Sequence, residues 1–121
     1  MKTYELFQGE ELKIAEKIQQ RRLQILVHSY IYYECNKNII SDRQFDMWGK
    51  ELVKLQKDYP EISKQVMYYE PFIGFDASTG FDLPYKDIDI VYKANRLLYK
   101  YNMKQDNVKQ EKETRKKGRL F

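Results

Sequence analysis

Between Gly9 and Cys35 the chain contains neither glycine nor proline, and its apolar residues recur at close to helical spacing. The pattern predicts one long helix over residues 9–35, which constrains the fold more than any other feature of the sequence. We expect this helix to end in the polar run Asn36-Lys37-Asn38, because asparagine can adopt the left-handed conformation that closes many helices. The recurring apolar positions are Leu12, Ala15, Ile18, Ile25 and Tyr32.

A second helix is predicted over residues 41–58. It begins with Ser41-Asp42-Arg43-Gln44, a capping-box pattern in which the serine accepts a hydrogen bond from a helical amide and the glutamine can reach back. Pro60 ends it. Because the connection to the first helix is short, the two helices should be antiparallel neighbours. We expect five residues to be buried between them or against a C-terminal helix: Ile25, Phe45, Trp48, Leu52 and Leu55.

The remainder of the chain is less regular. After Pro60 it becomes rich in aromatic residues and is interrupted by prolines and glycines, which indicates an ordered loop or a short hairpin. A last helix is expected from about Lys86 to Tyr101, with Ile90, Tyr92, Leu97 and Leu98 available to cover the hairpin. The predicted fold class is therefore mainly α: an antiparallel helical hairpin plus a C-terminal helix, with an aromatic-rich loop or short β-hairpin between.

Charge divides the chain into two parts. Residues 1–103 contain 15 Lys and Arg and 15 Asp and Glu, whereas residues 104–121 contain seven and three. We therefore expect a single helical domain over residues 1–103 and a basic, flexible tail over residues 104–121. A charge-balanced domain argues against a broad phosphate-binding surface, so nucleic acid is not an expected partner; a nucleic-acid role for the tail is the weaker alternative.

The sequence also indicates where the protein works. No apolar run approaches the roughly 18–20 residues that cross a bilayer, and the N-terminal residues lack the features of a secretory signal. We expect a cytoplasmic protein without membrane association. Cys35 is the only cysteine and His28 the only histidine, so we expect no disulfide, no metal site and no catalytic residue.

Aromatic and acidic side chains concentrate around the predicted hairpin turn. Tyrosines end the first helix, and two aspartates one turn apart begin the second, so both sets should converge at one end of the hairpin. Aromatic walls can hold a flat ring, and carboxylates accept hydrogen bonds from hydroxyl and amide groups. The simpler alternative is that the tyrosines only pack and that the helix dipole favours the first aspartate. The candidate ligand-binding residues are Tyr32, Tyr33, Asp42, Phe45, Asp46 and His28.

Residues 28–55 read H-S-Y-x-Y-Y and then S-D-x-x-F-D-x-x-x-x-E-L-x-x-L, which resembles the N-terminal helical module of NAD-dependent DNA ligases. In that family the module holds the nicotinamide mononucleotide half of NAD. The resemblance therefore implies NAD or nicotinamide mononucleotide as the ligand, contacted by Tyr32, Tyr33, Asp42, Phe45 and Asp46. The family usually has tyrosine at the position of Phe45, so a hydroxyl that could contact phosphate is missing while stacking remains possible.

The ligase resemblance covers about half of the chain, and the sequence lacks the K-x-D-G motif that carries adenylate in ligases. We therefore expect no ligase activity from this chain alone. It is similar to the small ligase-related proteins of phages and prophages. The first hypothesis is a non-catalytic binding module for NAD or a related nucleotide. The alternative is a phage-type inhibitor of a host machine that uses the hairpin as a scaffold and docks through its aromatic segment, Tyr68 to Tyr85.

Overall fold

The computed structural model describes residues 7–78, 80 and 82–118, with side chains described up to residue 105. Four α-helices follow one another along the chain: α1 (Glu10–Cys35), α2 (Asp42–Asp58), α3 (Pro60–Gln65) and α4 (Ile88–Gly118). A short 3-10 helix, η2 (Glu70–Phe72), lies between α3 and α4. These described residues contain no strand, which confirms the mainly α fold class. None of their helices has the length and apolar character needed to cross a membrane.

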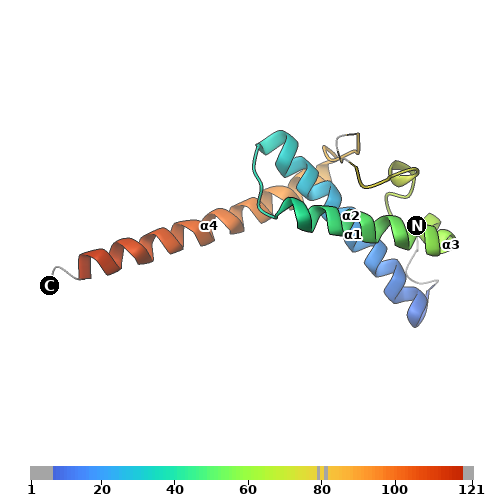
Figure 1. The fold of residues 1–121 in the computed structure, drawn as a ribbon, viewed down its shortest axis with the longest axis horizontal. Coiled ribbons are helices and arrows are strands. Elements are labelled where there is room, and N and C mark those ends of the chain that lie inside the picture. Colours follow the sequence, from blue (N-terminus) through green and yellow to red (C-terminus); the bar gives the residue numbers. More distant parts are fainter. Residues whose placement is uncertain (1–6, 79, 81, 119–121) are drawn as a thin grey trace.

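Helices α1 and α2 form the expected hairpin, and α2 runs back along α1 at an angle (Figure 1). Asn36 closes α1 in the left-handed conformation, with φ of 53°, and its backbone N–H donates to the carbonyl of Ile31. The Ser41 hydroxyl caps α2 by accepting a hydrogen bond from the Gln44 amide at 3.0 Å. Local sequence signals therefore set both ends of the turn, as the two capping motifs predict.

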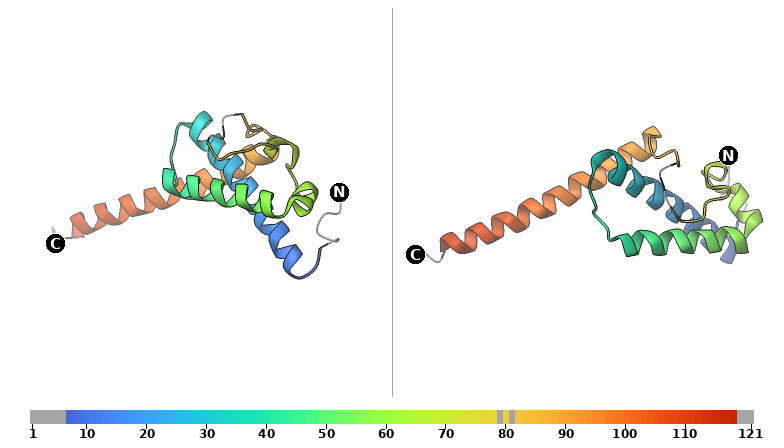
Figure 2. Two further views of the ribbon diagram at one scale, coloured as in Figure 1. Left: turned by 45° about the vertical axis from the view of Figure 1, so that its right-hand side comes forward. Right: turned by 45° about the horizontal axis from the view of Figure 1, so that its top comes forward.

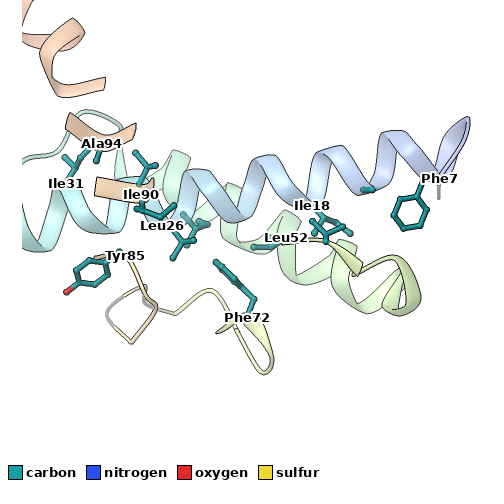
Figure 3. Packing of buried hydrophobic residues seen from close by; sticks show 13 residues of the cluster. Phe7, Ile18, Leu26, Ile31, Leu52, Phe72, Tyr85, Ile90 and Ala94 are labelled. Carbon is teal, nitrogen blue, oxygen red and sulfur yellow. The ribbon is translucent and has the colours of Figure 1, made fainter. Parts of the chain in front are cut away.

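The C-terminal half of α1 is the centre of the core. Five consecutive residues, 25–29, are buried, so this stretch of the helix is covered on all sides. Helices α2, α3 and α4 all contact it, and Figure 3 shows Leu52, Phe72, Tyr85 and Ile90 arranged around it. Of the five residues predicted to be buried in the hairpin, Ile25 and Leu52 are fully buried. The other three, Phe45, Trp48 and Leu55, are half-buried.

Arg22 is fully buried in α1 and ties this helix to α3 and the segment after it. Its Nε donates to the Gln56 side chain at 2.9 Å, and its Nη1 donates to the carbonyls of Val66 and Met67, both at 3.0 Å. Its Nη2 donates to the carbonyl and the hydroxyl of Ser63 at 3.2 and 2.7 Å. A guanidinium has five N–H donors, and these contacts use all five.

The segment between α3 and α4 packs its aromatic residues inward. Phe72 and Tyr85 belong to the core, and the rings of Phe72 and Phe75 meet edge to face at 5.0 Å. Close approach to the hairpin depends on Gly49 of α2, because a Cβ there would lie 2.9 Å from the Cβ of Ala77. The described residues of this segment form η2, turns and bends, so the predicted β-hairpin alternative is not what they adopt.

Helix α4 is longer than predicted and differs in the face it buries. It runs from Ile88 to Gly118 instead of ending at Tyr101, and beyond its first turns it extends away from the other helices (Figures 1 and 2). Ile90 and Ala94 are fully buried one turn apart, whereas Tyr92, expected to cover the hairpin, is 61% exposed. Two residues correspond to about 200° around a helix, so Tyr92 lies opposite the buried stripe.

Candidate functional site

A cavity of about 290 Å³ lies where the end of α1, the connection over residues 36–41 and the start of α2 meet. Five of the six candidate ligand-binding residues line it: His28, Tyr32, Tyr33, Asp42 and Phe45. The antiparallel hairpin therefore brings together the tyrosines that end α1 and the first turn of α2, as predicted.

The aromatic side chains that line the cavity differ in their contacts with other protein rings and in their exposure. Tyr33 stacks on Tyr85 with ring centroids 5.7 Å apart and 19° between the planes. It also meets Tyr32 edge to face at 4.9 Å. Tyr32 is half exposed, and Phe45 is half-buried in the opposite wall, on α2. Tyr32 and Phe45 are therefore the rings best placed to contact a flat ligand.

The two aspartates of α2 have different surroundings. Asp42 is exposed in the first turn of α2 and lines the cavity. Asp46 does not line it, and its carboxylate forms an ion pair with Lys50 at 2.8 Å along the helix. Helical spacing places both aspartates on one side of α2, but only Asp42 faces the cavity, so the acidic contribution to this cavity comes from Asp42.

His28 forms the floor of the cavity. Its side chain is 8% exposed, and its ring lies against that of Trp48 with centroids 5.5 Å apart. Burial lowers the pKa of His28 from 6.5 to about 4, so the ring is uncharged at neutral pH. The same residue lines a second cavity, of about 480 Å³, between the connection and α4.

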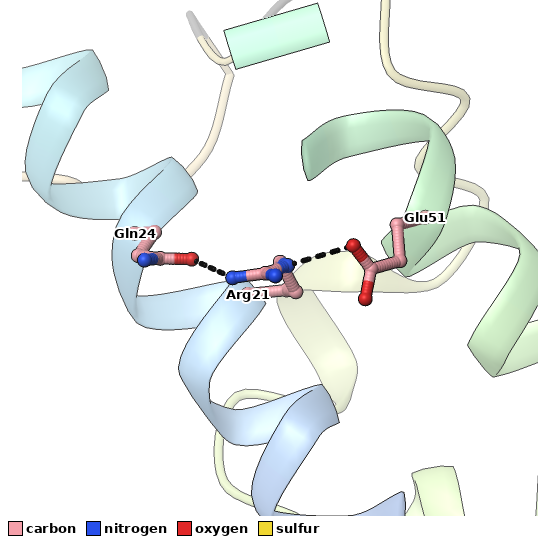
Figure 4. Close-up of polar contacts among 3 residues, drawn as sticks. All are labelled: Arg21, Gln24 and Glu51. Carbon is pink, nitrogen blue, oxygen red and sulfur yellow. Dashed lines mark hydrogen bonds and ion pairs between the residues drawn. The ribbon is translucent and has the colours of Figure 1, made fainter. Parts of the chain in front are cut away.

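An ion pair fixes α1 against α2 beneath the cavity. Arg21 of α1 donates from Nε to Glu51 of α2 at 3.1 Å and from Nη1 to Gln24 of its own helix (Figure 4). Its guanidinium also lies over the ring of Trp48, 5.6 Å from the centroid. Trp48 therefore contacts both Arg21 and His28 of α1, which helps to hold α2 against α1 near the cavity.

Several residues of the cavity wall were not among those predicted from the sequence. The connection supplies Lys37, Asn38, Ile39, Ile40 and Ser41, which its short length between two helix ends could have indicated. Ser29 of α1 lies beside His28, and Ser78 comes from the segment between η2 and α4. No local pattern could have indicated Ser78, because its position depends on how that distant segment packs on the hairpin.

Comparison with known proteins identifies a family that is similar to the first half of the chain. Residues 11–65, from the first turn of α1 to the end of α3, match the family model described as the DNA ligase-like, N-terminal NAD+-binding domain. The DNA ligase of Bacteroides fragilis is 44% identical over 54 residues, which cover 45% of this chain and 8% of that protein. No solved structure matches this chain significantly.

Other DNA ligases show the same limited overlap. The DNA ligase of Petrotoga mobilis is 43% identical over 49 residues, which cover 40% of this chain and 7% of that protein. The DNA ligase of Thermosipho africanus is 40% identical over 50 residues, which cover 41% of this chain and 8% of that protein. This chain spans less than a tenth of the length of these relatives. The part of the chain that forms the helical hairpin and most of the cavity wall is thus similar to the N-terminal NAD+-binding domain of DNA ligases.

Proposed function

We propose that this chain binds NAD+ or nicotinamide mononucleotide in the cavity at the turn of the α1–α2 hairpin. One observation carries the proposal: Tyr32, Phe45 and Asp42 converge on one cavity within the segment that matches an NAD+-binding domain. A flat, positively charged nicotinamide ring gains stacking and cation–π attraction from the aromatic rings. The Asp42 carboxylate supplies an acceptor for hydroxyl or amide hydrogens.

The charges around the cavity suit such a ligand. Burial keeps His28 uncharged at neutral pH, so the floor does not repel a cationic ring. Asp42 and Lys37 lie in the wall, the first suited to the ring or ribose and the second to a phosphate group. Phe45 offers no hydroxyl, so phosphate binding here depends on Lys37 and on backbone amides.

The size of the cavity favours one half of the dinucleotide. A volume of about 290 Å³ is at the lower limit of the roughly 300–1,000 Å³ of small-molecule sites, so the cavity suits a mononucleotide better than a complete dinucleotide. We therefore propose that the nicotinamide half occupies it and that the adenosine half lies outside.

We propose a binding role without catalysis, because this sequence contains no K-x-D-G motif. Such a module would act as a sensor, a sequestering protein or the partner of a separate enzyme. The alternative, an inhibitor that docks through residues 68–85, has less support. Phe72 and Tyr85 are buried in the core, so these two rings are not available to a protein partner.

Calorimetric titration tests the proposal. NAD+ and nicotinamide mononucleotide should bind, whereas ribose 5-phosphate, which lacks the nicotinamide ring, should bind much more weakly. Asp42→Asn should cost about 1.5–3 kcal/mol of binding free energy, since it removes the charge and keeps the shape. Asp46→Asn is the matched control: its carboxylate forms a surface ion pair with Lys50, so its loss should change binding by less than about 0.5 kcal/mol. Tight binding of ribose 5-phosphate, or equal effects of the two variants, would contradict the assignment.

A further inference from the structure

The second cavity, of about 480 Å³, lies between the connection of the hairpin and α4. Its wall is apolar where Ile39 and Ile40 of the connection face Leu97 and Met103 of α4. Tyr101, also in the wall, adds an aromatic ring. This composition suits the flat, weakly polar face of a nucleobase.

The two cavities are neighbours. His28, Ile39 and Ile40 line both, so these residues form a shared wall. At the surface, Lys37 lies in the wall of the first cavity, and its Nζ is 3.5 Å from Oδ1 of Asn102 on α4. The residues on either side of Asn102, Tyr101 and Met103, line the second cavity. The surface around Lys37 and Asn102 therefore offers a short route from the first cavity toward the second.

Positive charge gathers along this route. Lys100 and Lys104 line the second cavity and lie one turn apart on α4, on the same face of the helix. Neither of them, nor Lys37, forms an ion pair with any carboxylate in the described part of the chain. Ammonium groups without a carboxylate partner, beside an apolar wall, are suited to phosphate oxygens.

We propose that the second cavity binds the adenosine half of NAD+, with the base against the apolar wall and the pyrophosphate beside Lys37, Lys100 and Lys104. This inference rests on the proposed function, which leaves the adenosine half without a place in the first cavity. It assigns a role to α4, which lies outside the segment that matches the ligase domain. The chain thus contributes both halves of a dinucleotide site from its own residues.

The test compares NAD+, nicotinamide mononucleotide and adenosine monophosphate as separate titrants of the full chain. NAD+ should bind about tenfold or more tightly than nicotinamide mononucleotide, because it adds charge-assisted hydrogen bonds and base contacts. The double variant Lys100→Gln, Lys104→Gln should remove this preference and weaken adenosine monophosphate, while leaving the affinity for nicotinamide mononucleotide unchanged. Met103→Glu places a negative charge in the same cavity and should act in the same direction.

The matched control is Lys17→Gln, Lys93→Gln, which removes the same charge from exposed positions that line neither cavity. It should keep the preference for NAD+. The inference is overturned if NAD+ binds no more tightly than nicotinamide mononucleotide, or if the Lys100, Lys104 variant keeps the preference. If nicotinamide mononucleotide fails to bind while adenosine monophosphate binds and depends on these lysines, the first-cavity proposal fails and the second cavity stands. If neither mononucleotide binds, both proposals fail.

Discussion

Two buried serines, Ser63 and Ser29, differ in whether their hydroxyl groups form a hydrogen bond. Ser63 is 2% exposed, and its hydroxyl accepts a hydrogen bond from Arg22 at 2.7 Å. Ser29 is 1% exposed, and its hydroxyl has no hydrogen-bond partner among the described residues. It lies beneath Gly80, where any added Cβ would overlap it. A buried hydroxyl without a partner costs free energy, so Ser29 stabilises the fold little or not at all.

The two serines give a matched pair of variants. Ser63→Ala should lower the free energy of unfolding by about 1–3 kcal/mol, because it removes a buried partner of a charged group. Ser29→Ala should leave it unchanged or raise it by up to about 1 kcal/mol, since no hydrogen bond is lost. Denaturant unfolding of both variants measures the difference. Equal destabilisation would mean that the Ser29 hydroxyl has a partner in solution.

His28 should make stability depend on pH in a defined range. Its pKa is about 4 in the folded protein against an ordinary 6.5, so above pH 6.5 it is neutral in both states and contributes nothing. As the pH falls below 6.5, the unfolded chain takes up the proton first, and the free energy of unfolding decreases until about pH 4. The loss should total roughly 2–3 kcal/mol.

The control for this effect is His28→Gln, which lacks the titrating group while the carboxylates remain. The difference between the parent and this variant should therefore change between pH 6.5 and 4 and stay constant above pH 7. Unfolding curves collected across this range measure it. A difference that does not vary with pH would show that His28 becomes protonated as readily in the folded protein as in the unfolded chain.

At the residue scale, the predictable part of the site is the part fixed by helical spacing. Tyr32 and Asp42 reach one cavity because they flank a short turn between antiparallel helices. Arg22 could not be predicted: beside Arg21 it resembles one of a pair of surface charges, yet it is fully buried because α3 and the residues after it turn their carbonyls toward it. Arg21, one position earlier, points to Glu51 on α2 instead.

Among the elements, α1 and α2 follow their sequence signals closely and α4 does not. Asn36 caps the end of α1, and Ser41 caps the beginning of α2. The prediction that α4 ends at Tyr101 was not supported by a capping residue. The next glycine or proline after Tyr101 is Gly118, where the helix ends. The intervening residues are mostly Lys, Glu, Gln and Arg, which favour helix formation, so local propensity favours continuation of the helix.

The last part of α4 should therefore be dispensable. Its fully buried residues, Ile90 and Ala94, lie near its start, and the helix then extends away from the other elements (Figure 2). Deleting residues 106–121 keeps Lys100 and Lys104 and should change the free energy of unfolding by less than about 0.5 kcal/mol. Nucleotide affinity should also be unchanged. Loss of a salt-sensitive association with DNA on deletion would instead support a nucleic-acid role for residues 104–121.

In the whole molecule, the segment similar to ligases and the remainder of the chain form one core around α1. Leu52 of the hairpin, Phe72 and Tyr85 of the following segment, and Ile90 of α4 belong to the same cluster. Residues beyond the matched segment thus complete the burial of the hairpin and supply part of each cavity wall: Ser78 in the first, and five α4 residues in the second. Ligand binding in either cavity should therefore be detectable in elements far apart in the sequence.

Amide hydrogen exchange can separate the two cavities in the intact protein. Ligand binding slows exchange that occurs through global unfolding by the common factor 1 + [L]/Kd, so the informative signal is protection beyond that common decrease in rate. Nicotinamide mononucleotide should add protection at the end of α1, the connection over residues 36–41 and the start of α2. NAD+ should add the same protection and also slow exchange in α4 between residues 97 and 104. With Asp42→Asn, protection by the mononucleotide should require higher concentrations. If NAD+ protects only the amides that the mononucleotide protects, the adenosine half stays in solvent. Helix α4 then packs in the core and does not contact the ligand.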